Sequence, residues 1–212
     1  MRILDERVER YLQALRPERS EVMAEMEAVA ERDSVPIVAW ETGRLLATLC
    51  RALDPDVLEV GTAIGYSTLH MAQALERGRV VTLEREPDRA AQARSYLDRA
   101  GVADRVELVE GDALETIGSL DGPFGLLFVD ASKDQYRRYI ELAEPKLTER
   151  AVLVVDNLLM DGEVALPAGS ETGWSSVSLE AARRLNAELM ASERWLASVL
   201  PIGDGVGLGT RR

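Results

Sequence analysis

Five short apolar segments, separated by segments with helical character, constrain the fold of this chain most strongly. They occupy residues 57–61, 79–86, 105–113, 124–132 and 151–157. Strands that alternate with helices and are apolar along almost their whole length are typical of a parallel sheet that helices cover on both faces. The sequence therefore predicts an α/β fold with a doubly wound, Rossmann-like sheet.

The C-terminal segment adds two further strands. The run "WLASVLPIGDGVGLGTRR" contains two short apolar stretches joined at Gly203-Asp204-Gly205. A turn this short joins antiparallel strands, because a parallel crossover needs a much longer connection. We therefore expect a mostly parallel seven-stranded sheet that ends in an antiparallel hairpin.

Three helices are expected before the first strand, over residues 3–15, 18–32 and 41–52. In the first, Val8, Tyr11, Leu12 and Leu15 fall on one stripe, as in an amphipathic helix. A further helix is expected over 178–191, and the polar, glycine-containing residues 161–177 indicate one long loop. We expect one domain over 1–212, in which helices 1–52 precede an α/β core at 53–212.

Composition excludes several classes of protein. The net charge of −12 opposes a broad nucleic-acid-binding surface, which is built from Lys and Arg. One Cys and one His cannot build a conventional zinc site, so a bound metal would be held by oxygen ligands, as Mg²⁺, Mn²⁺ or Ca²⁺ is. No apolar run spans a bilayer, the charged N-terminus does not resemble a signal peptide, and one Cys forms no internal disulfide. We expect a cytoplasmic protein without membrane contact.

A glycine-containing turn follows the first strand in "LEVGTAIGYSTLHMA". Gly61 and Gly65 allow a tight turn and the close approach of a ligand. Ser67 falls at the start of the next helix, where free N–H groups favour polar or anionic groups. The spacing is not G-x-G-x-x-G, so a nicotinamide dinucleotide fits poorly. The alternative is a turn that only packs the strand against the helix.

Acidic residues at the ends of the next two strands strengthen the binding hypothesis. Glu84 ends the second strand, where an acid can accept hydrogen bonds from both hydroxyls of a ribose. Asp112 follows the third strand and, with the Ala113 N–H beside it, is a candidate contact for an adenine. Glu84 could instead be a solvated surface acid.

Six segments together resemble the cation-dependent O-methyltransferases that use S-adenosylmethionine, the catechol and caffeoyl-coenzyme-A O-methyltransferase group with its small bacterial members. The resemblance covers roughly residues 35–212 and rests on "LEVGTAIGYS", "TLERE", "GDALET", "FVDASKDQY", "VVDNLLMDG" and "LPIGDGVGL". It implies a class I methyltransferase fold, S-adenosylmethionine as cofactor and a homodimer. It also implies cofactor contacts from Val38, Glu59, Thr62 and Asp130.

Two strand ends carry candidate metal ligands. Asp130 ends the fourth strand and Asp156 and Asn157 end the fifth, and we expect these strands to be neighbours. Two carboxylates at one edge repel each other unless a divalent cation lies between them, and the Asn157 carbonyl adds a neutral oxygen. The alternative is that Asp156 and Asn157 only cap the strand and start a turn. In the family that the chain resembles, the matching three residues are metal ligands.

Lys133 is the candidate base. It follows Asp130 by three residues, and a lysine close to a divalent cation and a helix N-terminus gives up its proton more readily. The resemblance implies the same role, with Asp130 as its catalytic partner. A surface lysine, or a salt bridge to Asp134 or Glu141, is the alternative. His70 is expected to be a packed or surface imidazole.

These residues predict a metal-dependent O-methyltransferase that acts on a catechol-like, hydroxylated aromatic small molecule. Asp161 and Trp174 are candidate acceptor contacts. Ser132 replaces an acid that many members of the family carry, and Trp40 replaces a proline near the cofactor. Two alternatives stay open: methylation of a hydroxylated uridine in transfer RNA, and cofactor binding without catalysis.

Overall fold

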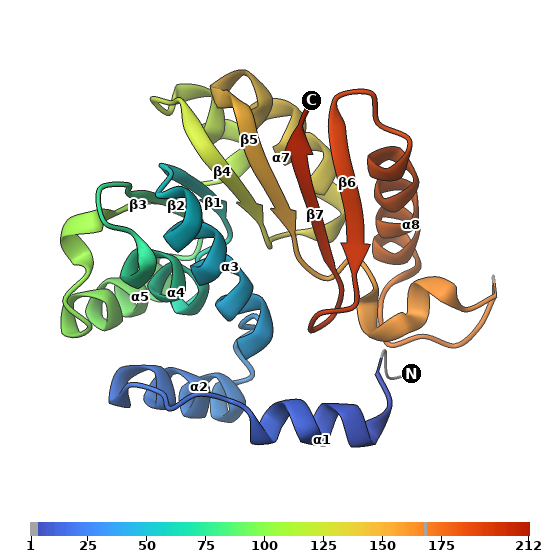
Figure 1. Cartoon of the computed structure of the whole chain (residues 1–212), viewed down its shortest axis with the longest axis horizontal. Coiled ribbons are helices and arrows are strands. Elements are labelled where there is room, and N and C mark those ends of the chain that lie inside the picture. Colours follow the sequence, from blue (N-terminus) through green and yellow to red (C-terminus); the bar gives the residue numbers. More distant parts are fainter. Residues whose placement is uncertain (1–3, 168) are drawn as a thin grey trace.

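The structure is a computed structural model that describes residues 4–167 and 169–212. One sheet has the strand order β3-β2-β1-β4-β5-β7-β6, in which β7 runs antiparallel to β5 and β6 and the other pairs are parallel (Figure 1). Its strands are β1 (Val57–Val60), β2 (Val80–Glu84), β3 (Val106–Glu110), β4 (Phe124–Val129), β5 (Leu147–Val155), β6 (Trp195–Leu200) and β7 (Val206–Arg211). The predicted seven-stranded sheet with a closing hairpin is confirmed.

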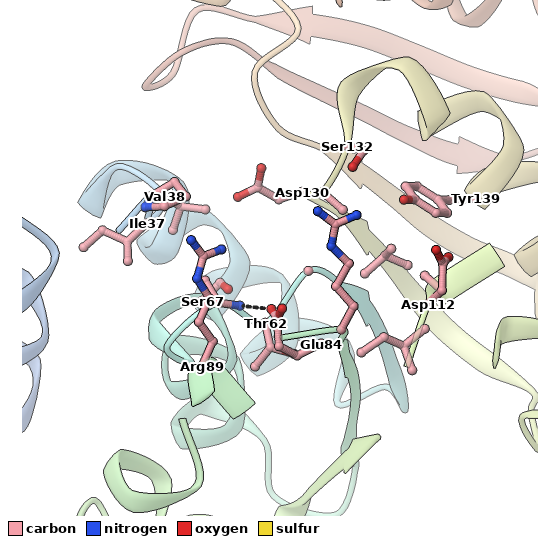
Figure 2. A pocket seen from close by; sticks show the side chains of 18 of the residues that line it. Ile37, Val38, Thr62, Ser67, Glu84, Arg89, Asp112, Asp130, Ser132 and Tyr139 are labelled. Atoms are coloured by element: carbon pink, nitrogen blue, oxygen red, sulfur yellow. Dashed lines mark hydrogen bonds between the residues drawn. The ribbon is translucent and has the colours of Figure 1, made fainter. Parts of the chain in front are cut away.

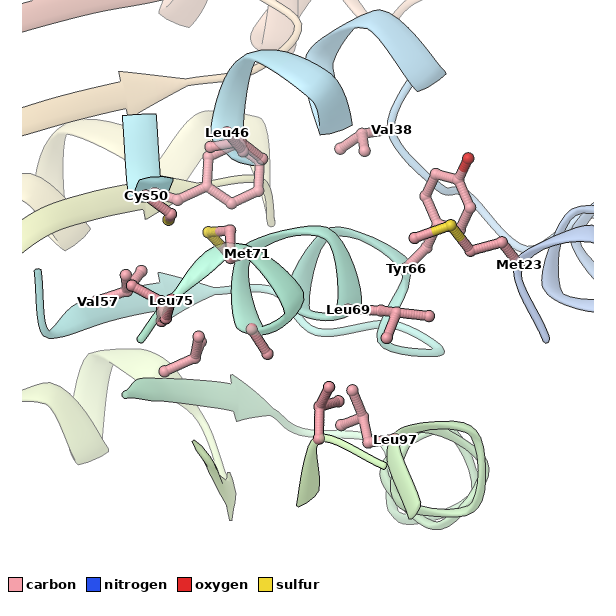
Figure 3. Packing of buried hydrophobic residues seen from close by; sticks show 14 of the residues in the cluster. Met23, Val38, Leu46, Cys50, Val57, Tyr66, Leu69, Met71, Leu75 and Leu97 are labelled. Atoms are coloured by element: carbon pink, nitrogen blue, oxygen red, sulfur yellow. The ribbon is translucent and has the colours of Figure 1, made fainter. Parts of the chain in front are cut away.

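Helices cover both faces of the sheet, and two apolar clusters fill the space between. In β4, Leu126 and Phe128 face one cluster, with helices α2 to α5, whereas Leu127 and Val129 face the other, with α7 and α8. Figure 3 shows part of the first cluster. The α-helices are α1 (Glu6–Ala14), α2 (Glu21–Asp33), α3 (Trp40–Leu53), α4 (Tyr66–Ala74), α5 (Pro87–Arg99), α6 (Ala113–Thr116), α7 (Tyr136–Ala143) and α8 (Ser176–Met190).

Short 3₁₀ helices connect several elements: η1 (Ala103–Arg105), η2 (Ile117–Ser119), η3 (Lys133–Gln135), η4 (Glu144–Lys146) and η5 (Met160–Ala165). The stretch predicted as one loop over 161–177 therefore contains most of η5 and the start of α8; its residue 168 lies outside the described residues. Helix α8 begins early because the Ser175 side chain accepts a hydrogen bond from the Ser178 N–H and caps it.

The register of the sheet brings three strand ends together. Val60 of β1 lies beside Val129 of β4, and Val129 lies beside Val155 of β5. The residues that follow, Gly61, Asp130 and Asp156, therefore emerge side by side at the carboxyl edge. Because the chain runs outward from β1 to β3 and then returns to β4, this edge is the topological switch point, where ligands bind in such sheets.

Several predicted boundaries shift. Strand β5 begins at Leu147 rather than 151, because Leu147 pairs with Phe124 of β4 across an irregularity. Strands β4 and β5 end at Val129 and Val155, one residue before the polar side chains that the prediction had included. The first helix begins at Glu6 because Asp5 caps it, and residue 3 of the predicted helix lies outside the described residues.

Helix α1 has no buried residue. Its predicted apolar stripe exists but is exposed: Val8, Tyr11 and Leu15 expose 45%, 64% and 56% of their surface. Figure 1 shows α1 apart from the sheet, below the C-terminal hairpin. Within the described residues, no helix has the length and apolar character needed to cross a membrane.

Candidate active site

A cavity of about 210 Å³ opens at the carboxyl ends of β1, β2 and β4 (Figure 2). Eight residues predicted to contact the cofactor line it: Val38, Gly61, Thr62, Ser67, Glu84, Asp112, Ala113 and Asp130. The other two, Glu59 and Gly65, are not among its lining residues. The structure therefore gathers most of the predicted cofactor set around one cavity.

Gly61 must be a glycine for two reasons. Its φ of +101° lies in the left-handed region that residues with a side chain avoid. A Cβ atom there would also lie 2.0 Å from the backbone oxygen of Asp130. The absence of a side chain thus lets β1 and β4 approach at the switch point, where the cavity forms.

Glu84 holds the turn and faces the cavity. Its Oε2 accepts a 2.8 Å hydrogen bond from the Ala63 N–H, and its Oε1 accepts a 2.9 Å bond from the Glu86 N–H. The side chain is buried, so the alternative of a solvated surface acid does not fit this position. Each carboxylate oxygen has a second lone pair that can accept a hydrogen bond from a bound hydroxyl.

Glu59 lies behind the turn. It is fully buried, and its two carboxylate oxygens accept hydrogen bonds of 2.5 Å from the hydroxyls of Ser67 and Thr68. Burial raises the pKa of Glu59 to about 7, although the hydroxyl hydrogen bonds act in the opposite direction. Glu59 thus anchors the start of α4, and its predicted direct contact with the cofactor stays a prediction.

Asp112 has a local partner in addition to the cavity. Its side chain accepts a 2.8 Å hydrogen bond from the Leu114 N–H and caps α6. The capping bond fixes the orientation of the carboxylate at the cavity wall.

Asp130 forms an ion pair with Lys133. The Lys133 ammonium donates a 2.8 Å hydrogen bond to Asp130 Oδ1, and the Tyr136 hydroxyl lies 3.4 Å from the same oxygen. The Lys133 side chain is only 16% exposed and that of Asp130 only 22%. Neither Asp134 nor Glu141, the partners considered from the sequence, takes this lysine. Tyr136 is fully packed, and burial, followed by the charges of Asp130 and Asp156, raises the pKa of its hydroxyl.

Asp156 is a buried carboxylate with an unsatisfied oxygen. Its Oδ1 has no hydrogen-bond partner, and the residue is 3% exposed. Burial raises the pKa of Asp156, and the negative charge of Asp130 raises it further. A divalent cation would relieve both effects, because it supplies the missing partner and neutralises the repulsion. The donor set fits a hard cation: two carboxylates and one amide oxygen.

That set contains only two acidic residues. Within residues 4–167 and 169–212, no group of three or more His, Cys, Asp and Glu side chains is arranged to hold a metal. The third protein ligand would be the amide of Asn157, whose φ of +59° turns the chain sharply after β5. Such a site leaves several coordination positions for water or ligand oxygens.

Asp204 orients the Asn157 amide and holds the Asp161 backbone, and the sequence analysis did not assign it a role. Its Oδ2 accepts a 3.1 Å hydrogen bond from Asn157 Nδ2, which leaves the Asn157 carbonyl oxygen for another partner. Its Oδ1 accepts a hydrogen bond from the Asp161 N–H. A signal was available: the hairpin turn joins the strand that pairs with β5, so an acid in it must lie near the end of β5.

Asp161 and Trp174, the predicted acceptor contacts, lie together. The Trp174 indole N–H donates a 3.2 Å hydrogen bond to Asp161 Oδ2. Glu163 holds the returning chain by accepting hydrogen bonds from the N–H groups of Gly173 and Trp174. Asp161 also lines a separate hollow between α1 and the hairpin turn, together with Glu9, Glu41 and Gly203.

Sequence reasoning missed part of the cavity wall. Arg85 and Arg89 follow β2 and line the cavity with Tyr139 and Ser132. Figure 2 shows the Arg89 side chain beside Ser67, on the same side as Val38. Arginines that follow the ribose acid in sequence were visible in "EREPDRA", but nothing in their spacing told them apart from surface residues.

A family model for O-methyltransferases matches residues 14–212. The chain belongs to this family. A catechol O-methyltransferase from Niastella koreensis is 38% identical over 162 residues, which cover 74% of this chain and 70% of the relative. The chain is therefore an S-adenosylmethionine-dependent O-methyltransferase of the catechol and caffeoyl-coenzyme-A type, as the resemblance implied.

Solved structures of similar proteins have the same fold. An O-methyltransferase from Streptomyces achromogenes, involved in tomaymycin synthesis and solved with S-adenosylmethionine, is 31% identical with a TM-score of 0.83; the alignment covers 96% of this chain and 95% of that one. An O-methyltransferase from Bacillus cereus, solved with S-adenosylhomocysteine, is 29% identical with a TM-score of 0.83 and 97% of both chains covered. The class I methyltransferase fold is thus confirmed.

Proposed function

We propose that this O-methyltransferase depends on a divalent cation and methylates a hydroxyl of a catechol-like small molecule. The unsatisfied oxygen of Asp156, beside Asp130 at the carboxyl edge, is the observation that carries the proposal. Asp130, Asp156 and Asn157 would hold Mg²⁺, Mn²⁺ or Ca²⁺. A cation there would lower the pKa of a coordinated hydroxyl and so favour the attacking oxyanion.

The cavity residues would position the methyl donor. Glu84 would accept hydrogen bonds from the ribose hydroxyls, Asp112 and Ala113 would border the adenine, and Ser67 and Val38 would border the amino-acid part; all five line the cavity. Gly61 and Thr62, in the turn after β1, would lie against the bound cofactor, because both line the cavity. S-adenosylmethionine supplies an electrophilic methyl group on a sulfonium. The protein contributes mainly by fixing the distance and direction of attack.

Lys133 would take the proton of the acceptor hydroxyl at Nζ. Its ammonium pairs with Asp130, a proposed metal ligand, and both residues line the cofactor cavity, which supports this role. Lys133 must first release its own proton to act as the base. The acceptor oxygen then forms a bond to the methyl carbon as the sulfonium–methyl bond breaks.

Asp161 and Trp174 would border the acceptor. Their hydrogen bond gives a flat indole a fixed orientation beside a carboxylate. Asp204 accepts hydrogen bonds from both the Asp161 N–H and the Asn157 amide, and so connects Asp161 to the proposed metal ligands. Two vicinal hydroxyls on a planar ring suit such a site, because they can fill two open coordination positions. The catechol O-methyltransferase from Niastella koreensis supports this acceptor class by its name.

The net charge of −12 speaks against transfer RNA as the acceptor, and the intact lysine and metal set speaks against a protein that binds the cofactor without catalysis. A homodimer, a cytoplasmic location, and one domain over 1–212 with helices 1–52 and a core at 53–212 stay predictions.

Turnover with a panel of acceptors tests the proposal. The protein is incubated with S-adenosylmethionine and Mg²⁺, and methylated products are measured by mass spectrometry. We expect rapid methylation of catechols and at least about a hundredfold less of the matched monophenols, which lack the second oxygen. Equal rates for both, or methylation of transfer RNA alone, would refute the catechol-like acceptor.

A further inference from the structure

A third hollow lies on the outer side of helices α3 and α4, next to the connection between α1 and α2. Its volume is about 300 Å³, and Arg16, Trp40, Arg44, Tyr66 and His70 form much of its wall. It shares only Tyr66 with the cofactor cavity. None of the roles proposed above uses the hollow itself.

Two buried nitrogen atoms in this wall lack a hydrogen-bond partner. They are Trp40 Nε1, an obligatory donor, and His70 Nε2. The His70 side chain is 9% exposed. A buried polar atom without a partner costs about 1–3 kcal/mol, and folded proteins leave few of them. His70 Nε2 lies against Gly43 of α3, so the Trp40 indole N–H is the donor that a polar ligand in this hollow can satisfy.

Charge at the hollow favours an anion. Arg16 and Arg19 both bond to Glu27, so their charges are partly neutralised. Arg44 is exposed, and among the described residues no carboxylate is paired with it. Glu18 at the rim is the only acidic lining residue in the described chain. A guanidinium without a partner is thus available in a protein whose net charge is −12.

His70 contributes as a neutral group. Burial lowers its pKa to about 4, and the positive charge of Arg44 lowers it further, partly opposed by Glu27. A neutral imidazole offers one donor and one acceptor nitrogen. The ring is pressed against α3, since a Cβ on Gly43 would lie 2.5 Å from it. Its position is therefore fixed by packing.

Aromatic rings and small apolar side chains form much of the remaining wall. The Tyr66 and His70 rings meet edge to face at 5.0 Å between centroids, and the Arg16 guanidinium lies 5.7 Å from the centre of the Trp40 ring. Met23, Ala47 and Ala74 add apolar surface, and Pro17, Ser20 and Gln73 also line the hollow. Aromatic walls of this kind accommodate planar rings, which stack or meet them edge to face.

We propose that this hollow is a binding site for a small carboxylate with a planar, apolar body. The carboxylate accepts hydrogen bonds from the Arg44 guanidinium and the Trp40 indole N–H. The planar body packs against the rings of Tyr66 and His70. Because Tyr66 also borders the cofactor cavity, an occupant would contact the wall that separates the two sites.

Nuclear magnetic resonance of ¹⁵N-labelled indole groups tests this site directly. Trp40, Trp174 and Trp195 each give one indole signal, and the Trp40→Phe variant assigns that of Trp40. The full chain is titrated with benzoate as the probe. We expect a saturable downfield shift of the Trp40 signal, because its N–H gains an acceptor, and the same shift in the Asp156→Asn variant, whose change lies at the active site.

Substitution of Arg44 gives the decisive comparison. Arg44→Ala should weaken benzoate binding at least about tenfold, because a charge-assisted hydrogen bond is lost. Arg51→Ala removes another exposed arginine of α3 and should leave the affinity unchanged. Arg44→Gln, which keeps most of the side-chain length, repeats the test if the alanine variant does not fold.

Three results with benzoate would overturn the proposal: a Trp40 signal that stays in place up to millimolar benzoate, equal benzoate affinity of the two arginine variants, or loss of the shift in the Asp156→Asn variant. Inorganic phosphate is the second probe. A phosphate affinity equal to that of benzoate would show a site for charge alone and would refute the planar carboxylate.

Discussion

The ammonium of Lys133 lies 2.8 Å from Oδ1 of Asp130, so the candidate base donates a hydrogen bond directly to a candidate metal ligand. Two variants separate charge from proton transfer. Lys133→Met should lower the catechol turnover about 10²–10⁴-fold. Lys133→Arg should be similarly slow, because arginine preserves the charge but does not give up its proton at neutral pH. Turnover restored by arginine would show that the positive charge alone matters.

Glu84 should contribute strongly to cofactor binding. Glu84→Gln weakens charge-assisted hydrogen bonds to the ribose and to the turn, so we expect about tenfold to hundredfold weaker binding of S-adenosylhomocysteine by calorimetry. Glu86→Gln, an exposed change two residues away, is the matched control and should bind normally. Equal affinities for the two variants would remove Glu84 from the ribose site.

Gly61→Ala should destabilise the fold and abolish cofactor binding. The new Cβ would overlap the Asp130 carbonyl oxygen. The alanine would also have to adopt the positive φ of Gly61, which residues with a side chain avoid. Gly101→Ala is the control: its φ is +71°, yet no atom lies within 4 Å of the added Cβ. In urea unfolding, Gly101→Ala should therefore cost only the backbone strain, about 1–2 kcal/mol, and Gly61→Ala clearly more. A Gly61→Ala variant as stable as Gly101→Ala would contradict the close approach.

Glu59 should make stability depend on pH near neutrality. Burial raises its folded-state pKa from 4.5 to about 7, so the folded state holds a proton that the unfolded state has released. Its contribution is fully present below pH 4.5 and is lost as the pH rises through 7, by ~3 kcal/mol in total. The Glu59→Gln variant should lack this loss. Parallel stability–pH curves for the two proteins between pH 4.5 and 8 would contradict it.

The fold was largely predictable because the strands are apolar on both sides. In β4, the alternation of Leu126 and Phe128 with Leu127 and Val129 serves two cores, and such a strand suits only a covered parallel sheet. Helix α1 shows the limit of this reasoning. Its apolar stripe follows helical periodicity as the stripes of buried helices do, yet none of its residues is buried. Periodicity predicts a helix but not what covers its face.

The site was predictable where a side chain directly follows a strand. Asp130 and Asp156 follow β4 and β5, so the sheet register alone places them side by side. The pairing of β7 with β5 places Asp204 near the end of β5, but the atoms that it contacts depend on how the hairpin turn folds back onto the residues after β5. Glu59 is not among the residues that line the cavity, and both of its carboxylate oxygens accept hydrogen bonds from the hydroxyls of Ser67 and Thr68, which no spacing rule indicates.

Dependence of methyl transfer on a divalent cation tests the central claim most directly. Initial rates of catechol methylation are measured after removal of metal with a chelator, and again after Mg²⁺ is added back, for the native protein and for Asp156→Asn. We expect the native rate to fall to background with the chelator and to return with Mg²⁺, whereas Asp156→Asn stays slow at any Mg²⁺ concentration that restores the native protein. Full activity in excess chelator would contradict the account.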